Sequence, residues 1–316
     1  MELLGRQTRV DALTPTDLEK LRAALAKDRG PVALAMDIRV TRMVLKYAYD
    51  AGLIDRPVRV AMLKQPSRRV LREYRQRNGQ RMLEADEIRA LLVVAKQPMK
   101  AMVLLGVNGG LGNTDIACLP KSAFNPNGWL NYPRPKTAVD RRIPLWPETV
   151  EALQKAIAVR PEPDNPADGD LVFLTRSGRR WVEHSRGEKR TWKDAIGLEF
   201  GKLLRLPRCP ACGALQTRQH VEKCSACEWG QTIDRGWGKL HRPGINFYVL
   251  RHVCETIGGE NGDQVATDYV MGHVRDDMAS LYRERISDDR LRRVTEHMRQ
   301  WLFGADDDAE ARNDDV

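Results

Sequence analysis

Two pairs of cysteines, each with two residues between its members, are the clearest chemical signal in this sequence. The first pair is Cys209 and Cys212, the second is Cys224 and Cys227, and eleven residues separate the pairs. This spacing is typical of two loops that donate four thiolates to one tetrahedral Zn²⁺ ion, which leaves no open position and makes the ion structural. A redox-active dithiol or four unrelated free thiols are the alternatives. The sequence therefore predicts a structural zinc in an insert at about residues 207–230.

Three further groups of polar residues lie in the C-terminal part of the chain. They are Tyr248-Val-Leu-Arg251-His252, then Met271-Gly-His273, then Leu281-Tyr282. In order and spacing they resemble the H-x-x-R-H box, the L-G-H box and the nucleophilic tyrosine of the tyrosine recombinase (phage integrase) family. The segment from Lys136 to Leu145 resembles the family's β-hairpin with its catalytic lysine. The resemblance extends back to Met82, and more faintly to residues 14–58, which are similar to the family's DNA-clamping N-terminal domain.

The resemblance implies DNA recombination or integration by strand cleavage and rejoining through a 3′-phosphotyrosine intermediate. Tyr282 would be the nucleophile, Arg251 and His273 would bind the scissile phosphate, and Lys136 would protonate the departing 5′-oxygen. Such a reaction needs a nucleophile, cations beside the growing negative charge and an acid for the leaving group. It requires no catalytic metal and no nucleotide cofactor. The implied partners are double-stranded DNA and further copies of the chain, in a tetramer that joins two DNA segments.

Two positions depart from the family's pattern. Gly112 stands where the first catalytic arginine is expected, and Tyr248 stands where a histidine opens the H-x-x-R box, although its hydroxyl can still hydrogen-bond a phosphate oxygen. Loss of one phosphate-binding cation should cost roughly 3 to 4 kcal/mol of transition-state stabilisation, by analogy with one lost oxyanion donor. Backbone N–H groups at residues 112–113 are one alternative anion site. Nearby arginines are the other: Arg134, Arg141 and Arg142.

Two other functions are compatible with the sequence. A catalytically impaired protein of the same fold would bind a DNA site and regulate or block recombination. Gly112 favours this alternative, whereas the joint presence of Lys136, Arg251, His273 and Tyr282 favours an enzyme. The second alternative is a zinc-ribbon module that binds protein or RNA. In that case replacing the zinc cysteines would abolish function, while Tyr282→Phe would leave it intact.

The charge of the chain favours a nucleic-acid partner. The net charge is +9, and the last twelve residues hold six acids and one arginine, so residues 1–304 carry +14. Basic side chains release counterions from DNA, which makes such a body typical of DNA-binding proteins; a solubilising surface is the alternative. No run of eighteen apolar residues occurs, and the N-terminus is not apolar. The sequence therefore predicts that the chain has no membrane span and no signal peptide. We expect a cytosolic protein, associated with the nucleoid if the host is bacterial.

Hydrophobic periodicity predicts a mainly α protein with a small antiparallel β-sheet, in the α+β class. A helical N-terminal domain is expected at residues 1–63, with fewer helices than the family usually has there. Its helices should open near Thr16 and Pro31, and the second should bury Ile38, Met43, Val44 and Tyr47. A basic linker follows at residues 64–81. We expect its arginines to lie along a DNA backbone: Arg68, Arg69, Arg72, Arg75 and Arg77.

A catalytic domain is expected at residues 82–304. The pattern predicts helices at about 84–95, 100–107 and 147–159, strands at 129–132, 141–145 and 171–174, and helices after Ile245. Residues 305–316 are expected to form an acidic disordered tail.

Overall fold

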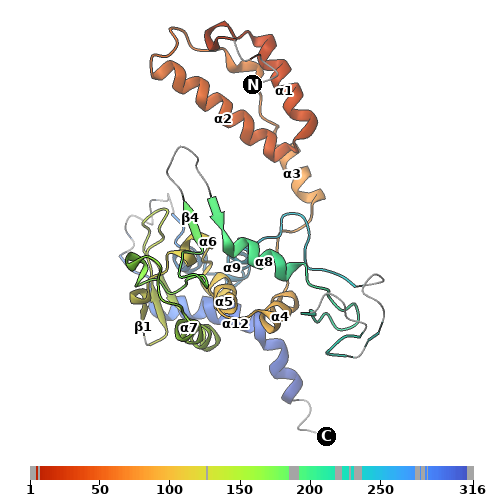
Figure 1. The fold of residues 1–316 in the computed structure, drawn as a ribbon, viewed down its shortest axis with the longest axis vertical. Helices are drawn as coiled ribbons and strands as arrows, with labels where there is room; N and C mark the ends of the chain where they lie inside the picture. The colour runs from red at the N-terminus through yellow and green to blue at the C-terminus, as the bar shows by residue number, and fades with distance from the viewer. Residues whose placement is uncertain are drawn as a thin grey trace. The chain divides into compact units, whose positions relative to one another are not determined.

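The computed structural model describes residues 5, 8–125, 127–184, 192–217, 223–227, 229–230, 237–274, 278, 282 and 284–311. The chain divides into an N-terminal unit, Met1–Gln80, and a C-terminal unit, Arg81–Val316 (Figure 1). It is mainly helical with a small antiparallel sheet, as the sequence predicts. None of the described helices combines the length and the apolar character needed to cross a membrane.

The N-terminal unit is built on two helices, α1 (Pro15–Asp28) and α2 (Pro31–Asp50), with short 3₁₀ turns at Val10–Ala12 and Val60–Met62. Thr14 caps α1, since its hydroxyl accepts from the Asp17 amide while the Asp17 carboxylate accepts from the Thr14 amide. The core of the unit is small and consists of Leu18, Leu34, Ile38, Leu45 and Leu63.

The buried face of α2 differs from the expected one. Ile38 is buried, but Met43, Val44 and Tyr47 are exposed, with Tyr47 65% accessible. The buried positions are instead Leu34, Ile38 and Leu45. The apolar stripe of α2 is wider than the surface its neighbours in this unit cover, so hydrophobic periodicity alone did not determine which side is buried.

The segment expected to be a basic linker contains a helix, α3 (Arg68–Arg77), and belongs to the N-terminal unit. The Ser67 hydroxyl accepts from the Val70 amide at its start, and Arg69 pairs with Glu73 one turn later at 2.8 Å. Tyr74 packs against Gly30, where an added Cβ would lie 2.8 Å from the tyrosine hydroxyl. The five arginines of the segment, Arg68, Arg69, Arg72, Arg75 and Arg77, are all exposed.

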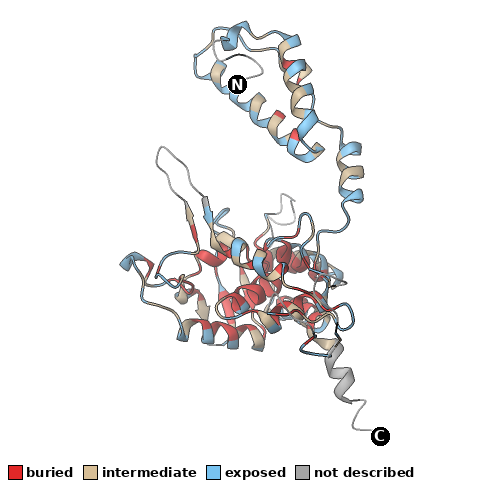
Figure 2. Cartoon of the chain, turned by 45° about the vertical axis from the view of Figure 1, so that its right-hand side comes forward, coloured by how far each residue is buried: buried red, intermediate tan, exposed pale blue. Residues whose placement is uncertain are grey.

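The C-terminal unit is organised around α5 (Met99–Gly109), in which every residue from Ala101 onward is buried. Its neighbours include α7 (Pro147–Ala158), α9 (Val249–Glu260) and α12 (Asp288–Ala311). Gly106 permits the approach of α9, because a Cβ there would lie 2.9 Å from a Leu250 methyl group. Figure 2 shows the buried residues concentrated in these central helices.

The other helices in the described part of this unit are shorter. They are α4 (Ala85–Val94), α6 (Asn113–Ala117), α8 (Ala195–Leu204) and α10 (Gln264–Met271), with 3₁₀ turns at Lys121–Ala123 and Pro166–Asp168. α12 continues to Ala311, so its last turns lie within the segment expected to be an acidic tail.

Two antiparallel sheets occur in the described part of the C-terminal unit. One has the order β1 (Phe124–Asn125), β2 (Trp129–Asn131) and β3 (Arg142–Pro144), with Trp129 opposite Pro144. The other pairs β4 (Val182–His184) with β5 (Trp192–Asp194). The strands near residues 129 and 142 agree with the prediction, but the one expected at 171–174 is wrong. Only an isolated bridge between Pro120 and Leu171 forms there. Residues 171–174 are buried, and a short buried apolar run does not by itself distinguish a strand from another buried segment.

Candidate active site

A cavity of about 590 Å³ in the C-terminal unit brings four segments together, one of them the junction of β5 and α8 with Asp194 and Gly197. The start of α6 contributes Gly112, the connection between β2 and β3 contributes Arg134 and Lys136, and the start of α9 contributes Tyr248 and Arg251. Four of the candidate residues named from the sequence therefore share one cavity: Arg134, Lys136, Tyr248 and Arg251. The wall also contains two carboxylates, Asp115 and Asp194.

Two backbone carbonyls bind the guanidinium group of Arg251. Its side chain is buried, with 3% accessibility for the residue, and its Nη2 donates to the Met271 carbonyl at 2.8 Å. Nη1 donates to the Gly110 carbonyl at the end of α5. Burial, followed by the nearby charge of Arg134, lowers the pKa of Arg251. The guanidinium is thus fixed at the cavity wall by neutral acceptors, which leave its positive charge available to an anion.

The two departures from the family's pattern are neighbours in space. An added Cβ at Gly112 would lie 3.4 Å from the ring of Tyr248, an ordinary van der Waals distance. The backbone of Gly112 has φ −86° and ψ 174°, which any residue can adopt. The aromatic ring therefore stands beside the place from which an arginine side chain would start. The Gly112 amide already donates to Asp115 Oδ2 at 3.3 Å.

Lys136 lies on a hairpin that extends beyond the paired residues of β2 and β3. The Tyr132 amide donates to the Arg141 carbonyl at 3.1 Å, and the Arg134 amide donates to the Val139 carbonyl at 2.8 Å. The turn closes at Ala138, which adopts a positive φ of 53°. Lys136 is exposed near the tip of this hairpin and is one of the residues that line the cavity.

Arg141 and Arg142 are engaged elsewhere. The Arg141 side chain is completely buried, bonds to Asp115 Oδ2 at 3.1 Å, and donates through Nε to the Tyr132 carbonyl at 2.9 Å. Arg142 forms two 2.8 Å bonds to Asp288 and stacks on the Trp129 ring with its guanidinium carbon 4.1 Å from the centroid. Both guanidinium groups already have carboxylate partners.

His273 follows α10 and is oriented by two acids. Its Nδ1 lies 3.1 Å from Glu255 Oε2 and 3.5 Å from Asp268 Oδ1. Interaction with the neighbouring His273 imidazole lowers the pKa of Glu255, so this carboxylate is ionised at neutral pH. Because Nδ1 faces the acids, Nε2 is the nitrogen left for other partners. Sequence reasoning missed Glu255, although its position one turn after Arg251 on α9 places both on the same side of the helix.

Tyr282 is 77% accessible and is not part of the cavity lining. Within residues 275–283 the structure describes only Met278 and Tyr282, so the predicted Leu281 neighbour lies outside the described residues. An exposed tyrosine can meet a phosphate of bound DNA without unfolding a core. The exposure of Tyr282 is therefore compatible with the role that the resemblance implies.

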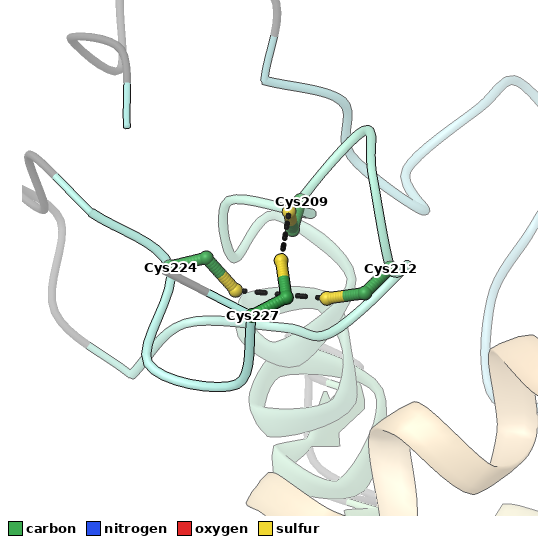
Figure 3. A group of neighbouring side chains, drawn as sticks. All are labelled: Cys209, Cys212, Cys224 and Cys227. Carbon is green, nitrogen blue, oxygen red and sulfur yellow. Dashed lines mark hydrogen bonds between the residues drawn. The ribbon is translucent and has the colours of Figure 1, made fainter. Parts of the chain in front are cut away.

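The four cysteines at residues 209–227 converge, as Figure 3 shows. Cys209 and Cys227 have sulfurs 3.7 Å apart, and Cys212 and Cys224 have sulfurs 3.6 Å apart, too long for disulfides. All four sulfurs lie within 4.8 Å of one another.

A buried glutamine and a surface ion pair fix the cysteine loops. The buried Gln216 donates to the Cys224 sulfur at 3.4 Å and accepts from the Ser225 amide at 3.1 Å. Arg208, beside the first cysteine, pairs with Asp86 of α4 at 2.7 Å. The insert is therefore tied to the helical body as well as to itself.

Comparison with solved structures identifies proteins whose fold is similar to that of this chain. No protein-family model matches the sequence, and no curated protein does. The integrase of transposon Tn1549, solved in complex with a circular intermediate DNA, superposes with a TM-score of 0.57 at 17% identity, covering 92% of this chain and 88% of that one. A lambda integrase dimer bound to a COC′ core site gives 0.53 at 14% identity, over 88% and 84%. A lambda integrase tetramer bound to a Holliday junction gives 0.54 at 16% identity, over 90% and 69%. The chain therefore has the fold of these integrases.

Proposed function

We propose that this protein is a tyrosine recombinase that exchanges DNA strands at specific sites. The observation that carries the proposal is the cavity in which Arg251, Lys136 and Arg134 meet, within a fold shared with integrases solved on DNA. The excess of basic over acidic residues before the tail supports a polyanionic partner. The exposed arginines of α3 offer further phosphate contacts.

In the proposed reaction the Tyr282 oxygen attacks a DNA phosphorus and forms a 3′-phosphotyrosine bond as the bond from phosphorus to the 5′-oxygen breaks. The phenolic proton passes to solvent water, and Lys136 donates a proton to the departing 5′-oxygen. Arg251 binds the non-bridging oxygens, and His273 hydrogen-bonds the same phosphate through Nε2. The Tyr248 hydroxyl can add one more hydrogen bond. Attack by a 5′-hydroxyl of the second DNA reverses the step and joins the strands, with no metal ion or nucleotide consumed.

The proposed partners are double-stranded DNA and three more copies of the chain. Strand exchange between two duplexes requires four cleaved strands, each with its own nucleophile. The lambda integrase tetramer on a Holliday junction offers a precedent for this assembly. The protein would act in the cytosol, at the nucleoid if the host is bacterial.

The cysteine cluster fits a structural zinc. A tetrahedral site with zinc–sulfur bonds of about 2.3 Å has sulfurs about 3.8 Å apart. Two of the six sulfur pairs here are 3.6 and 3.7 Å apart, and all six lie within 4.8 Å. Cys209, Cys212, Cys224 and Cys227 would hold the ion and leave no place for a substrate. The zinc would stabilise an insert that has few buried side chains of its own.

Recovery of protein-linked DNA tests the proposed function. Cells expressing the wild-type protein or Tyr282→Phe are lysed in denaturant, the protein is captured, and the attached DNA is sequenced. We expect covalent adducts at defined sites with the wild type and none with Tyr282→Phe, because the phenylalanine ring has no oxygen to bond to phosphorus. Equal absence of adducts from both samples would contradict strand cleavage.

A DNA-binding regulator of the same fold is the second candidate. The absence of a side chain at Gly112 favours it, because a phosphate clamp with one cation fewer stabilises the transition state less. This candidate predicts that native crosslinking finds defined DNA sites for both proteins while denaturing capture finds none.

A further inference from the structure

We propose that Arg134 supplies the second guanidinium of the phosphate-binding site, in place of the arginine that Gly112 does not provide. This inference rests on the proposed strand cleavage. It assigns the phosphate-binding role to a residue of the hairpin between β2 and β3, two positions before Lys136. The same loop would then carry both a cation for the phosphate and the acid for the leaving oxygen.

The backbone directs Arg134 toward the site. Its amide donates to the Val139 carbonyl at 2.8 Å, and its carbonyl accepts from the Ala138 amide at 2.8 Å, so the hairpin fixes its position. Its Cβ packs over Gly272, where an added Cβ would lie only 3.2 Å away. Gly272 precedes His273, so Arg134 is in contact with the segment that presents the histidine.

The head group of Arg134 has few partners. Nη1 donates to the Gly272 carbonyl at a long 3.4 Å, and the buried Nε has no hydrogen-bond partner. Among the described residues no carboxylate forms an ion pair with it, in contrast to Arg141 and Arg142. A half-buried cation with unused donors is incompletely stabilised, and an anion in the cavity would satisfy both charge and donors.

The charges around the cavity support the same conclusion. Arg134 faces a second cation, Arg251, and its charge contributes to the lowered pKa of Arg251 after the larger effect of burial. Of the two carboxylates in the wall, Asp115 forms an ion pair with Arg141, and Asp194 accepts hydrogen bonds from Asn113 at 2.6 Å and from the Gly197 amide. Two guanidinium groups therefore line one cavity, and among the described residues neither forms an ion pair with a carboxylate. A phosphate would relieve their repulsion.

A rescue experiment tests the role of Arg134. Covalent protein–DNA adducts are quantified from cells expressing the wild type, Arg134→Ala, Gly112→Arg/Arg134→Ala, and Gly112→Arg/Arg251→Ala. We expect Arg134→Ala to lower the yield about 100- to 1,000-fold, the effect of one lost oxyanion donor. Gly112→Arg should recover at least about 10-fold of this loss, because it restores a guanidinium at a position whose backbone accepts any residue. It should not rescue Arg251→Ala.

The matched control is Arg176→Ala. Arg176 is exposed in the same unit, lies outside this cavity, and makes no hydrogen bond or ion pair within the described part of the chain. It should therefore yield wild-type amounts of adduct. An Arg134→Ala protein with the wild-type yield overturns the proposal. So does a loss that Gly112→Arg leaves unrecovered, since Arg134 would then serve some other role.

A second readout separates this inference from the proposed cleavage. Inorganic phosphate is titrated at constant ionic strength into purified wild type, Arg134→Ala and Arg176→Ala, and the melting midpoint is followed by tryptophan fluorescence. We expect phosphate to stabilise the wild type and Arg176→Ala more than Arg134→Ala. If wild-type cells yield no adduct, strand cleavage fails, and a phosphate response that depends on Arg134 still supports the anion site. An equal response in all three proteins overturns the inference.

Discussion

Replacing Asp115 by Asn should strongly destabilise the C-terminal unit. The Asp115 carboxylate is the only ion-pair partner of the Arg141 guanidinium among the described residues, at 3.1 Å. The Arg141 side chain has no exposed surface, and burial lowers its pKa despite the favourable charge of Asp115. The neutral amide would leave a buried positive charge uncompensated, which costs about 3 to 5 kcal/mol.

The damage would extend to the active site. Asp115 also accepts from the Gly112 amide, and the Arg141 side chain packs on Gly272, where an added Cβ would lie 2.6 Å from its Cδ. The ion pair thus lies beneath both the start of α6 and the segment that carries His273. Removing it should loosen the cavity as well as lower the free energy of unfolding.

Urea unfolding followed by tryptophan fluorescence measures this effect. All seven tryptophans lie after residue 80, so their fluorescence reports the C-terminal unit alone. Thermal unfolding, followed by the same fluorescence, gives a second measure. At about 2 to 4 °C per kcal/mol for a unit of this size, the melting temperature should fall by about 6 to 20 °C. The double variant Asp115→Asn/Arg141→Met should be more stable than Asp115→Asn, because it removes the stranded charge. A loss below about 1 kcal/mol for Asp115→Asn would refute the reasoning, since it would mean that water or another group solvates Arg141.

Two further predictions concern His273 and the cysteine insert. Glu255→Gln should lower the adduct yield at pH 7.5 by up to about 100-fold through misorientation of His273, and an unchanged yield would exclude a positioning role for Glu255. The pKa of Glu255 is lowered in the folded state, so the ionised carboxylate stabilises the fold fully above about pH 5. This stabilisation is lost as the pH falls through the lowered pKa. The stability difference between wild type and Glu255→Gln should therefore shrink in acid. Metal analysis should find about one zinc per chain in the wild type and less in Cys212→Ser. Chelation of the zinc should make the insert sensitive to protease, while the helical core keeps its cooperative melting. A metal-free protein with a protease-resistant insert would contradict the zinc site.

The sequence predicted the fold class and many elements because their signals are local. Apolar residues at helical spacing mark α5 and α7, and alternating residues bounded by turn formers mark β2 and β3. Local patterns failed where several outcomes fit the same residues. The apolar stripe of α2 could not reveal which side its neighbours cover, and the buried run at residues 171–174 does not need to pair as a strand.

The candidate site also contains some residues that the sequence identified and others that only the structure could distinguish. Residue types and spacing were enough to select the cysteine pairs, because a thiolate knuckle needs four sulfurs in this arrangement. Arg251 and Lys136 were selected by the resemblance to the tyrosine recombinase family. The sequence alone could not choose among Arg134, Arg141 and Arg142. The three lie within nine residues on one hairpin, and what separates them is their partners from distant segments: Asp115 for Arg141, Asp288 for Arg142, and a single weak carbonyl contact for Arg134. Only the tertiary structure brings those carboxylates into contact, and it is this pairing that leaves one cation available for a phosphate.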